Sequence, residues 1–152
     1  MRRPEWRAGV ERVLGSSWTS CSPVLTAATT SPSGWATTGA YYRTGAKVAY
    51  RFQLTAGASV TAGSGNYRLS LPLPTVALPE FVMVGQATAY DTSTGNRAPL
   101  QVFVPSAVTD YVEFRYSATW LGTSTALGPG APFTWADGDN ISGTVVYEAA
   151  LI

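Results

Sequence analysis

Hydrophobic and polar residues alternate along most of the chain with the period of two that is typical of β-strands. Strands are predicted at 47–54, 67–71, 81–89, 101–104, 112–120 and 141–149. Turns rich in glycine, proline, asparagine and aspartate separate these segments. Short strands at this regular spacing predict an all-β fold, either an antiparallel β-sandwich or a jelly roll.

The alternation also predicts the core, because every second residue of a strand points to the same side of the sheet. Glu113 falls on the opposite phase, where we expect it to face outward beside Arg115 as a cross-strand partner. The aromatic residues on the inward phase are Tyr50, Phe52, Phe114, Tyr116, Trp120 and Tyr147.

The start of the chain has a different pattern, with apolar residues at helical spacing. Pro4 suits a first helical turn, Glu5 suits the positive end of the helix dipole, and Gly15 suits the stop. Three surfaces fit the apolar face: the chain's own domain, another protein or a lipid surface. The residues expected to carry attachment here are Arg2, Arg3, Trp6, Arg7, Val10, Arg12, Val13 and Leu14.

The next segment, 16–38, is a mixture of serine, threonine, alanine, proline and glycine that contains Trp18 and Trp35. It is too aromatic for a plain linker and too irregular for a helix, so we predict an extended arm. The expected organisation is an attachment helix at 1–15, an extended arm at 16–38 and a β domain at 39–152. Trp18, Trp35, Tyr41 and Tyr42 lie outside clear strands and are candidates for contact with a ligand or a neighbouring subunit.

The charge of the chain excludes some classes of partner. The formal net charge is +1, and charged residues make up 12% of the 152 residues, about half the usual fraction. Serine and threonine number 14 and 19, so the surface is mostly neutral and hydroxyl-rich. We expect no nucleic-acid partner, and such a surface favours an extracellular or particle-bound protein. No apolar run approaches the roughly 20 residues of a membrane span, so we expect no membrane partner either.

The sequence contains no histidine, which excludes Ser-His-Asp and Cys-His triads and histidine zinc sites. Cys21 is the single cysteine, so no disulfide can form within the chain. Asp137 and Asp139 flank Gly138 in an acidic segment that we interpret as a tight turn rather than a calcium loop. The remaining carboxylates show no spacing that pairs them for glycosidase chemistry. We expect no catalytic residue, no cofactor and no metal.

Three stretches share a recognisable pattern. The segment 39–48 reads GAYYRTGAKV, 63–72 reads GSGNYRLSLP, and 132–139 reads PFTWADGD ahead of Tyr147 and Glu148. Together they resemble small β-rich virion surface proteins of tailed bacteriophages of actinobacteria, over about residues 16–149. The motif residues are expected to specify the fold, with glycines at turns, Leu71 and Pro72 ending a strand, and Trp135 packed over the last turn. The turn glycines are Gly39, Gly45, Gly63 and Gly65.

The resemblance implies a structural or adhesive protein of the particle surface that is commonly trimeric and has no catalytic activity. We therefore expect a non-enzymatic capsid decoration protein, of the minor capsid or head-fibre kind, located on the virion surface. Its expected partners are copies of itself in a homotrimer and the major capsid protein or another virion protein, reached through the N-terminal segment. The alternative is a minor tail or tail-fibre tip protein that binds a host receptor or cell-wall glycan through the loops 91–96 and 122–130.

Overall fold

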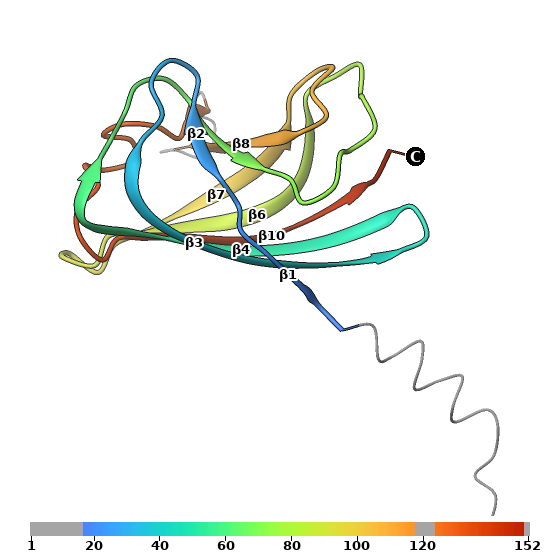
Figure 1. Cartoon of the computed structure of the whole chain (residues 1–152). Helices are drawn as coiled ribbons and strands as arrows, with labels where there is room; N and C mark the ends of the chain where they lie inside the picture. The colour runs from blue at the N-terminus through green and yellow to red at the C-terminus, as the bar shows by residue number, and fades with distance from the viewer. Residues whose placement is uncertain (1–16, 118–123, 151–152) are drawn as a thin grey trace, which may run out of the picture.

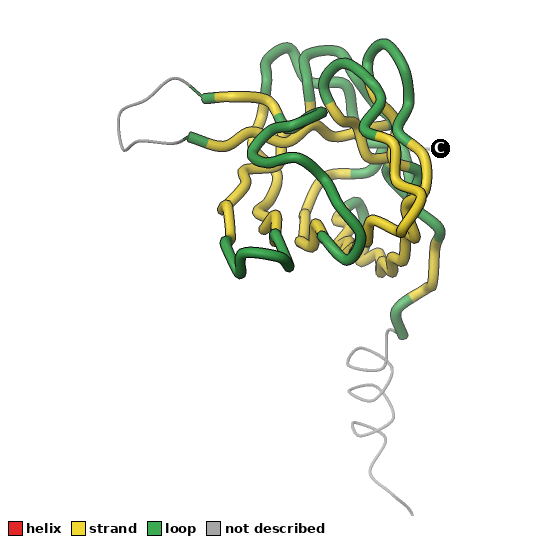
Figure 2. The backbone as a smooth tube through the Cα atoms, turned by 90° about the vertical axis from the view of Figure 1, so that its left-hand side faces the viewer, coloured by secondary structure: helices red, strands yellow, loops and turns green. Residues whose placement is uncertain are grey.

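A computed structural model describes residues 17–117 and 124–150, and every regular element among them is a β-strand (Figures 1 and 2). The predicted helix at 1–15 lies outside the described residues, and so does Trp120. The strands are β1 (Thr19–Cys21), β2 (Leu25–Ala27), β3 (Ser33–Thr44), β4 (Lys47–Thr61), β5 (Tyr67–Ser70), β6 (Val82–Tyr90), β7 (Arg97–Val104), β8 (Tyr111–Tyr116), β9 (Thr125–Ala126) and β10 (Asn140–Glu148).

All neighbouring strands pair antiparallel, in the order β1-β3-β4-β10-β6-β7-β8-β5-β2, with β9 added to β8. The prediction of an all-β antiparallel fold is confirmed. The sandwich or jelly roll predicted with it has two packed sheets, whereas the strands here belong to one hydrogen-bonded sheet. Figure 1 shows how this sheet curls, so that β2 and β8 lie across the interior from β3, β4 and β10.

The curl brings the two ends of the strand order close together. β1 and β2 occupy opposite ends, yet only three residues join them, which limits the distance between Cys21 and Leu25 to about 14 Å. The backbone N–H of Val24 in this connection donates to Ser70 Oγ of β5 at 2.8 Å. Tyr50 of β4 reaches across the interior and donates its hydroxyl proton to the Ser70 carbonyl at 3.3 Å.

Residues 17–38, predicted as an arm separate from the domain, belong to the sheet. They contain β1, β2 and the first half of β3, and β1 and β2 add a strand at either end of the order. The segment is extended, as its composition predicts. Leu25, Cys21, Ala27 and Trp35 of this segment, however, join the same core as the rest of the chain, and β3 runs without a break across residue 38.

The core fills the inside of the curl. Tyr50, Phe52, Phe114 and Tyr147 are buried as predicted, and Tyr116 is partly buried against the same cluster. Phe52 packs edge-on against Phe114, with ring centroids 5.8 Å apart. Burial raises the pKa of Tyr50, and it raises the pKa of Tyr147 to about 12. Both hydroxyls therefore stay protonated and act as hydrogen-bond donors inside the fold.

The motif residues take up fold-specifying positions. Gly45, Gly63 and Gly65 have φ of 60°, 67° and 91°, so they sit in turns as predicted. Trp135 is buried and donates its indole N–H to the Gly128 carbonyl at 2.9 Å. Gly39 does not sit in a turn. It lies inside β3, where an added Cβ would approach the Pro23 side chain to 2.9 Å, so this glycine is needed for close packing.

Candidate interaction surfaces

Trp18 is the exposed aromatic residue nearest to the N-terminal segment. It directly precedes β1, and 39% of its surface is exposed. Its ring meets Tyr42 of β3 edge-on, with centroids 4.8 Å apart, and the Arg51 guanidinium of β4 lies 4.3 Å above it. Two contacts hold the ring in place, so little conformational entropy would be lost when another surface packs on it. We call Trp18, Tyr42 and Arg51 the Trp18 cluster.

Trp35, the other predicted contact residue of residues 17–38, faces the core. Its ring lies 5.2 Å from the ring of Trp135 and 6.3 Å from that of Tyr67, both edge-on. Its indole N–H is shielded from solvent and has no acceptor among the described residues. Part of Trp35 also lines a hollow of about 320 Å³ between β3 and the connection from β1 to β2. Tyr41, on the same side of β3, likewise packs against the core.

The structure does not describe the other predicted attachment residues, Arg2 to Leu14, which lie within residues 1–16. The place where this segment joins the domain is defined, because residue 17 leads into β1, which lies at one end of the strand order. The Trp18 cluster therefore lies where the predicted attachment segment joins the domain. Cys21 of β1 packs partly against the core, and burial raises the pKa of its thiol.

Arginine side chains stack on aromatic rings over the outer face of the sheet, which we define as the side opposite the core. Besides Arg51 on Trp18, Arg68 lies 4.6 Å from the Tyr111 ring, Arg97 4.2 Å from Tyr90, and Arg115 5.1 Å from Phe81. The sequence did not predict these pairs, because the residues of each pair lie on different segments of the chain that meet only when the strands pair. Each contact fixes a guanidinium over an apolar plane and leaves its N–H groups at the edge for an acceptor.

Glu113 pairs with an arginine of the neighbouring strand β5. It lies opposite Arg68 in the register of β5 and β8, and its Oε1 accepts a hydrogen bond from Arg68 Nε at 3.4 Å. Only 8% of Glu113 is exposed. The carboxylate was predicted to face outward beside Arg115 as a cross-strand partner. It lies on the same phase of β8 as Arg115, and its partner across the strands is Arg68 of β5. Among the described residues, 17–117 and 124–150, this is the one ion pair. Arg115 therefore has no carboxylate partner in this part of the chain.

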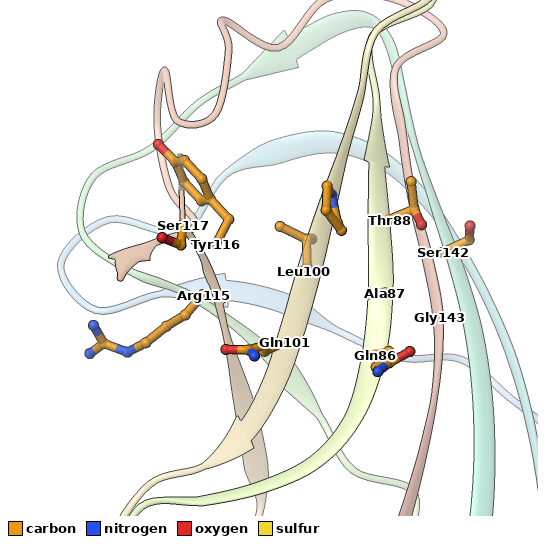
Figure 3. A pocket seen from close by; sticks show the side chains of 11 residues that line it. Gln86, Ala87, Thr88, Leu100, Gln101, Arg115, Tyr116, Ser117, Ser142 and Gly143 are labelled. Carbon is orange, nitrogen blue, oxygen red and sulfur yellow. The ribbon is translucent and has the colours of Figure 1, made fainter. Parts of the chain in front are cut away.

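A hollow of about 500 Å³ lies on the outer face across four adjacent strands, β10, β6, β7 and β8. Gln86 of β6 lies opposite Gln101 of β7, and Gln101 opposite Arg115 of β8, so the three side chains form one row. Figure 3 shows this row along one side of the hollow. The other lining residues include Thr88, Pro99, Tyr116, Ser117 and Ser142.

The acidic segment around Asp137 is the tight turn that its sequence predicts. Asp139 is 1% exposed, and its Oδ1 accepts hydrogen bonds from the N–H and the hydroxyl of Thr92 at 2.9 and 3.1 Å. Its Oδ2 accepts the Ala136 N–H at 2.8 Å. The carboxylate thus joins the turn before β10 to the turn between β6 and β7. Across the described ranges, no group of three cysteine or acidic residues is close enough to hold a metal ion.

Two loops, 91–96 and 122–130, were predicted for receptor binding. Because β6 to β8 pair antiparallel, the chain leaves β6 toward the first loop and β8 toward the second at the same end of the sheet. Residues 118–123 are outside the described part. In the first loop the Asp91 carboxylate accepts hydrogen bonds from the Ser93 hydroxyl and N–H at 2.7 and 3.0 Å. The Ser93 hydroxyl is the main reason that the pKa of Asp91 is lowered. This loop satisfies its own carboxylate and presents short hydroxyl side chains.

Comparison with models of known protein families, with curated proteins and with solved structures gives no match for this chain. In the described part of the chain, no helix has the length and hydrophobicity needed to span a membrane.

Proposed function

We propose that the chain is a non-enzymatic structural protein of the virion surface of a tailed bacteriophage, of the capsid decoration kind, and that it attaches to the particle through its N-terminal segment. The phage assignment rests on the sequence resemblance carried by 39–48, 63–72 and 132–139. The structural observation that supports attachment is the position of the Trp18 cluster, at the end of the sheet where the N-terminal segment joins.

The proposed contact has two parts. The apolar face of the predicted helix, from Trp6 to Leu14, packs on the major capsid protein or another virion protein, and its arginines meet acidic groups there. Trp18 extends this contact onto the domain, because an exposed, immobilised tryptophan is a typical centre of a protein interface. In a homotrimer, three such contacts act together and gain affinity through effective concentration.

Deletion of residues 1–15 tests this proposal. We expect the shortened protein to fold, because the described core is formed entirely from residues after Ser17, and to lose binding to particles stripped of the protein. Trp18→Ala in the full chain should weaken binding in the same assay, while Val24→Ala serves as a control because Val24 is 56% exposed and lies outside the Trp18 cluster. Binding of the shortened protein at the full affinity would contradict the proposal.

The second candidate function is that of a minor tail or tail-fibre tip protein that binds a host receptor or a cell-wall glycan. The observation that favours it is the hollow on the outer face, one side of which carries Gln86, Gln101 and Arg115, since capsid attachment through the N-terminal segment does not require such a site. Binding of the purified domain to host cells in the absence of particles distinguishes this function from capsid decoration.

A further inference from the structure

The outer-face hollow combines groups that recognise hydroxyls with one group that recognises an anion. Gln86 and Gln101 supply exposed side-chain amides, which can donate and accept hydrogen bonds. Thr88 and Ser142 supply hydroxyls, and Arg115 supplies a guanidinium. No aspartate or glutamate lines the hollow. A ligand that matches this lining carries many hydroxyl groups and a negative charge.

The strand register fixes the spacing of these groups. Gln86, Gln101 and Arg115 come from three neighbouring strands in direct register. Adjacent strands lie about 4.8 Å apart, so the row extends over about 10 Å. The sheet backbone holds the Cα positions rigidly, and this favours a ligand whose polar groups repeat along an extended chain.

Arg115 is held in position before any ligand arrives. Its guanidinium lies 5.1 Å from the Phe81 ring, and Phe81 itself stacks on Phe103 with ring centroids 4.5 Å apart. Phe81 is 39% exposed, so an apolar surface continues from the hollow onto this ring. A guanidinium fixed over a ring keeps its N–H groups at the edge, where they can bind a carboxylate or phosphate in a bidentate manner.

From these observations we infer that the outer-face hollow is a binding site for an acidic oligosaccharide. Arg115 contacts the carboxylate or phosphate of the ligand, and Gln86 and Gln101 contact the sugar hydroxyls. A protein partner is a poorer match, because the row along one side of the hollow offers amides and a guanidinium in place of large apolar anchors. A nucleic acid is also a poorer match, because Arg115 is the single basic residue that lines the hollow.

Nuclear magnetic resonance of the full chain, free of particles, tests this inference separately from the attachment proposal. The probes are tetragalacturonate, its fully methyl-esterified form, which has the same sugars without charge, and a mannopentaose phosphate. We expect saturable shifts of the Gln86 and Gln101 side-chain amide signals with the acidic probes. The two acidic probes distinguish a carboxylate from a phosphate as the preferred anion.

Variants assign the charge effect to one residue. Arg115→Gln should weaken binding of the better acidic probe about tenfold or more, since a charge-assisted contact is lost, and should leave binding of the methyl ester nearly unchanged. Gln101→Glu places a carboxylate directly opposite Arg115 in the register of β7 and β8. It should also weaken binding of the acidic probe, because the new carboxylate pairs with Arg115 and repels the anion of the ligand. Arg43→Gln is the matched control, because Arg43 is exposed at the turn between β3 and β4 and lies outside the hollow.

Three results would overturn the inference. These are the lack of saturable binding by either acidic probe, shifts confined to residues outside the hollow, and equal losses in Arg115→Gln and Arg43→Gln, which would indicate nonspecific attraction by positive charge.

Discussion

The buried carboxylate of Asp139 joins two turns of the fold, and its replacement by alanine tests the structural role of this contact. Asp139→Ala removes the acceptor of three hydrogen bonds, from the Thr92 N–H, the Thr92 hydroxyl and the Ala136 N–H. The Thr92 hydroxyl can turn to solvent, because Thr92 is exposed. The two backbone N–H groups lose their partner at a site where the carboxylate was 1% exposed.

The expected loss of stability follows from these two groups. A buried donor without a partner costs about 1–3 kcal/mol, and water that enters the vacated space reduces this toward the lower end. We therefore expect Asp139→Ala to lower the free energy of unfolding by about 3 kcal/mol. For a domain of this size, that corresponds to a fall in Tm of about 6–12 °C.

Urea unfolding followed by tryptophan fluorescence measures this loss, and Asp137→Ala is the matched control. Asp137 lies two residues away and carries the same charge, but it is exposed. Its replacement should change stability by less than about 0.5 kcal/mol. Added calcium should leave the Tm of the original chain unchanged, because turn N–H groups occupy both oxygens of Asp139. Equal losses in the two variants, or a calcium-dependent Tm, would refute the structural role of Asp139.

Three other outcomes are expected. Trp35→Ala should lower the free energy of unfolding in urea by about 3 kcal/mol, because it removes ring contacts with the core. Trp18→Ala removes an exposed ring and should lower the free energy of unfolding by less than 1 kcal/mol. Similar losses in the two variants would contradict the placement of these rings. Gly143→Ala should lower stability by about 1–3 kcal/mol, because its Cβ would lie 2.5 Å from that of Ala87, and an unchanged urea midpoint would contradict this packing. Burial raises the pKa of Tyr67 and of Tyr147 to about 12. In the unfolded chain a tyrosine ionises at about pH 10, so above this pH the unfolded state loses protons that the folded state keeps. The urea midpoint should therefore stay constant up to about pH 10 and fall between pH 10 and 12. A midpoint that is flat across this range would show that these hydroxyls ionise equally in both states.

The alternation of residues predicted β4 to β8, β10 and most of the core, because burial of one sheet face imposes a period of two on the sequence. It did not predict β3, whose small residues and glycines show no clear alternation. Tyr50, Phe52, Phe114 and Tyr147 were identified in this way. The arm at 16–38 was misplaced, because β1 and β2 have three residues each and are stabilised by pairing with distant strands rather than by their own pattern. Strands this short carry too few residues for periodicity to be detected.

The candidate sites were harder to predict for the same reason. Trp18 was recognised as a contact residue from its position outside a clear strand, and its exposure agrees with that role. The outer-face hollow was missed, because Gln86, Gln101 and Arg115 have ordinary outward positions in three separate strands. Only the register brings them into one row, and the sequence specifies the register through the fold as a whole. The cross-strand partner of Glu113, Arg68, could not be named from the sequence for the same reason.

We propose that this protein decorates a phage capsid through its N-terminal segment, and localisation on particles tests this proposal most directly. Tagged full-length protein is added to particles stripped of the native copies, and the label is located by negative-stain electron microscopy after the oligomeric mass has been measured by light scattering. We expect a trimer whose label covers the capsid shell. Label confined to the tail tip, or binding to host cells but not to particles, would contradict capsid decoration.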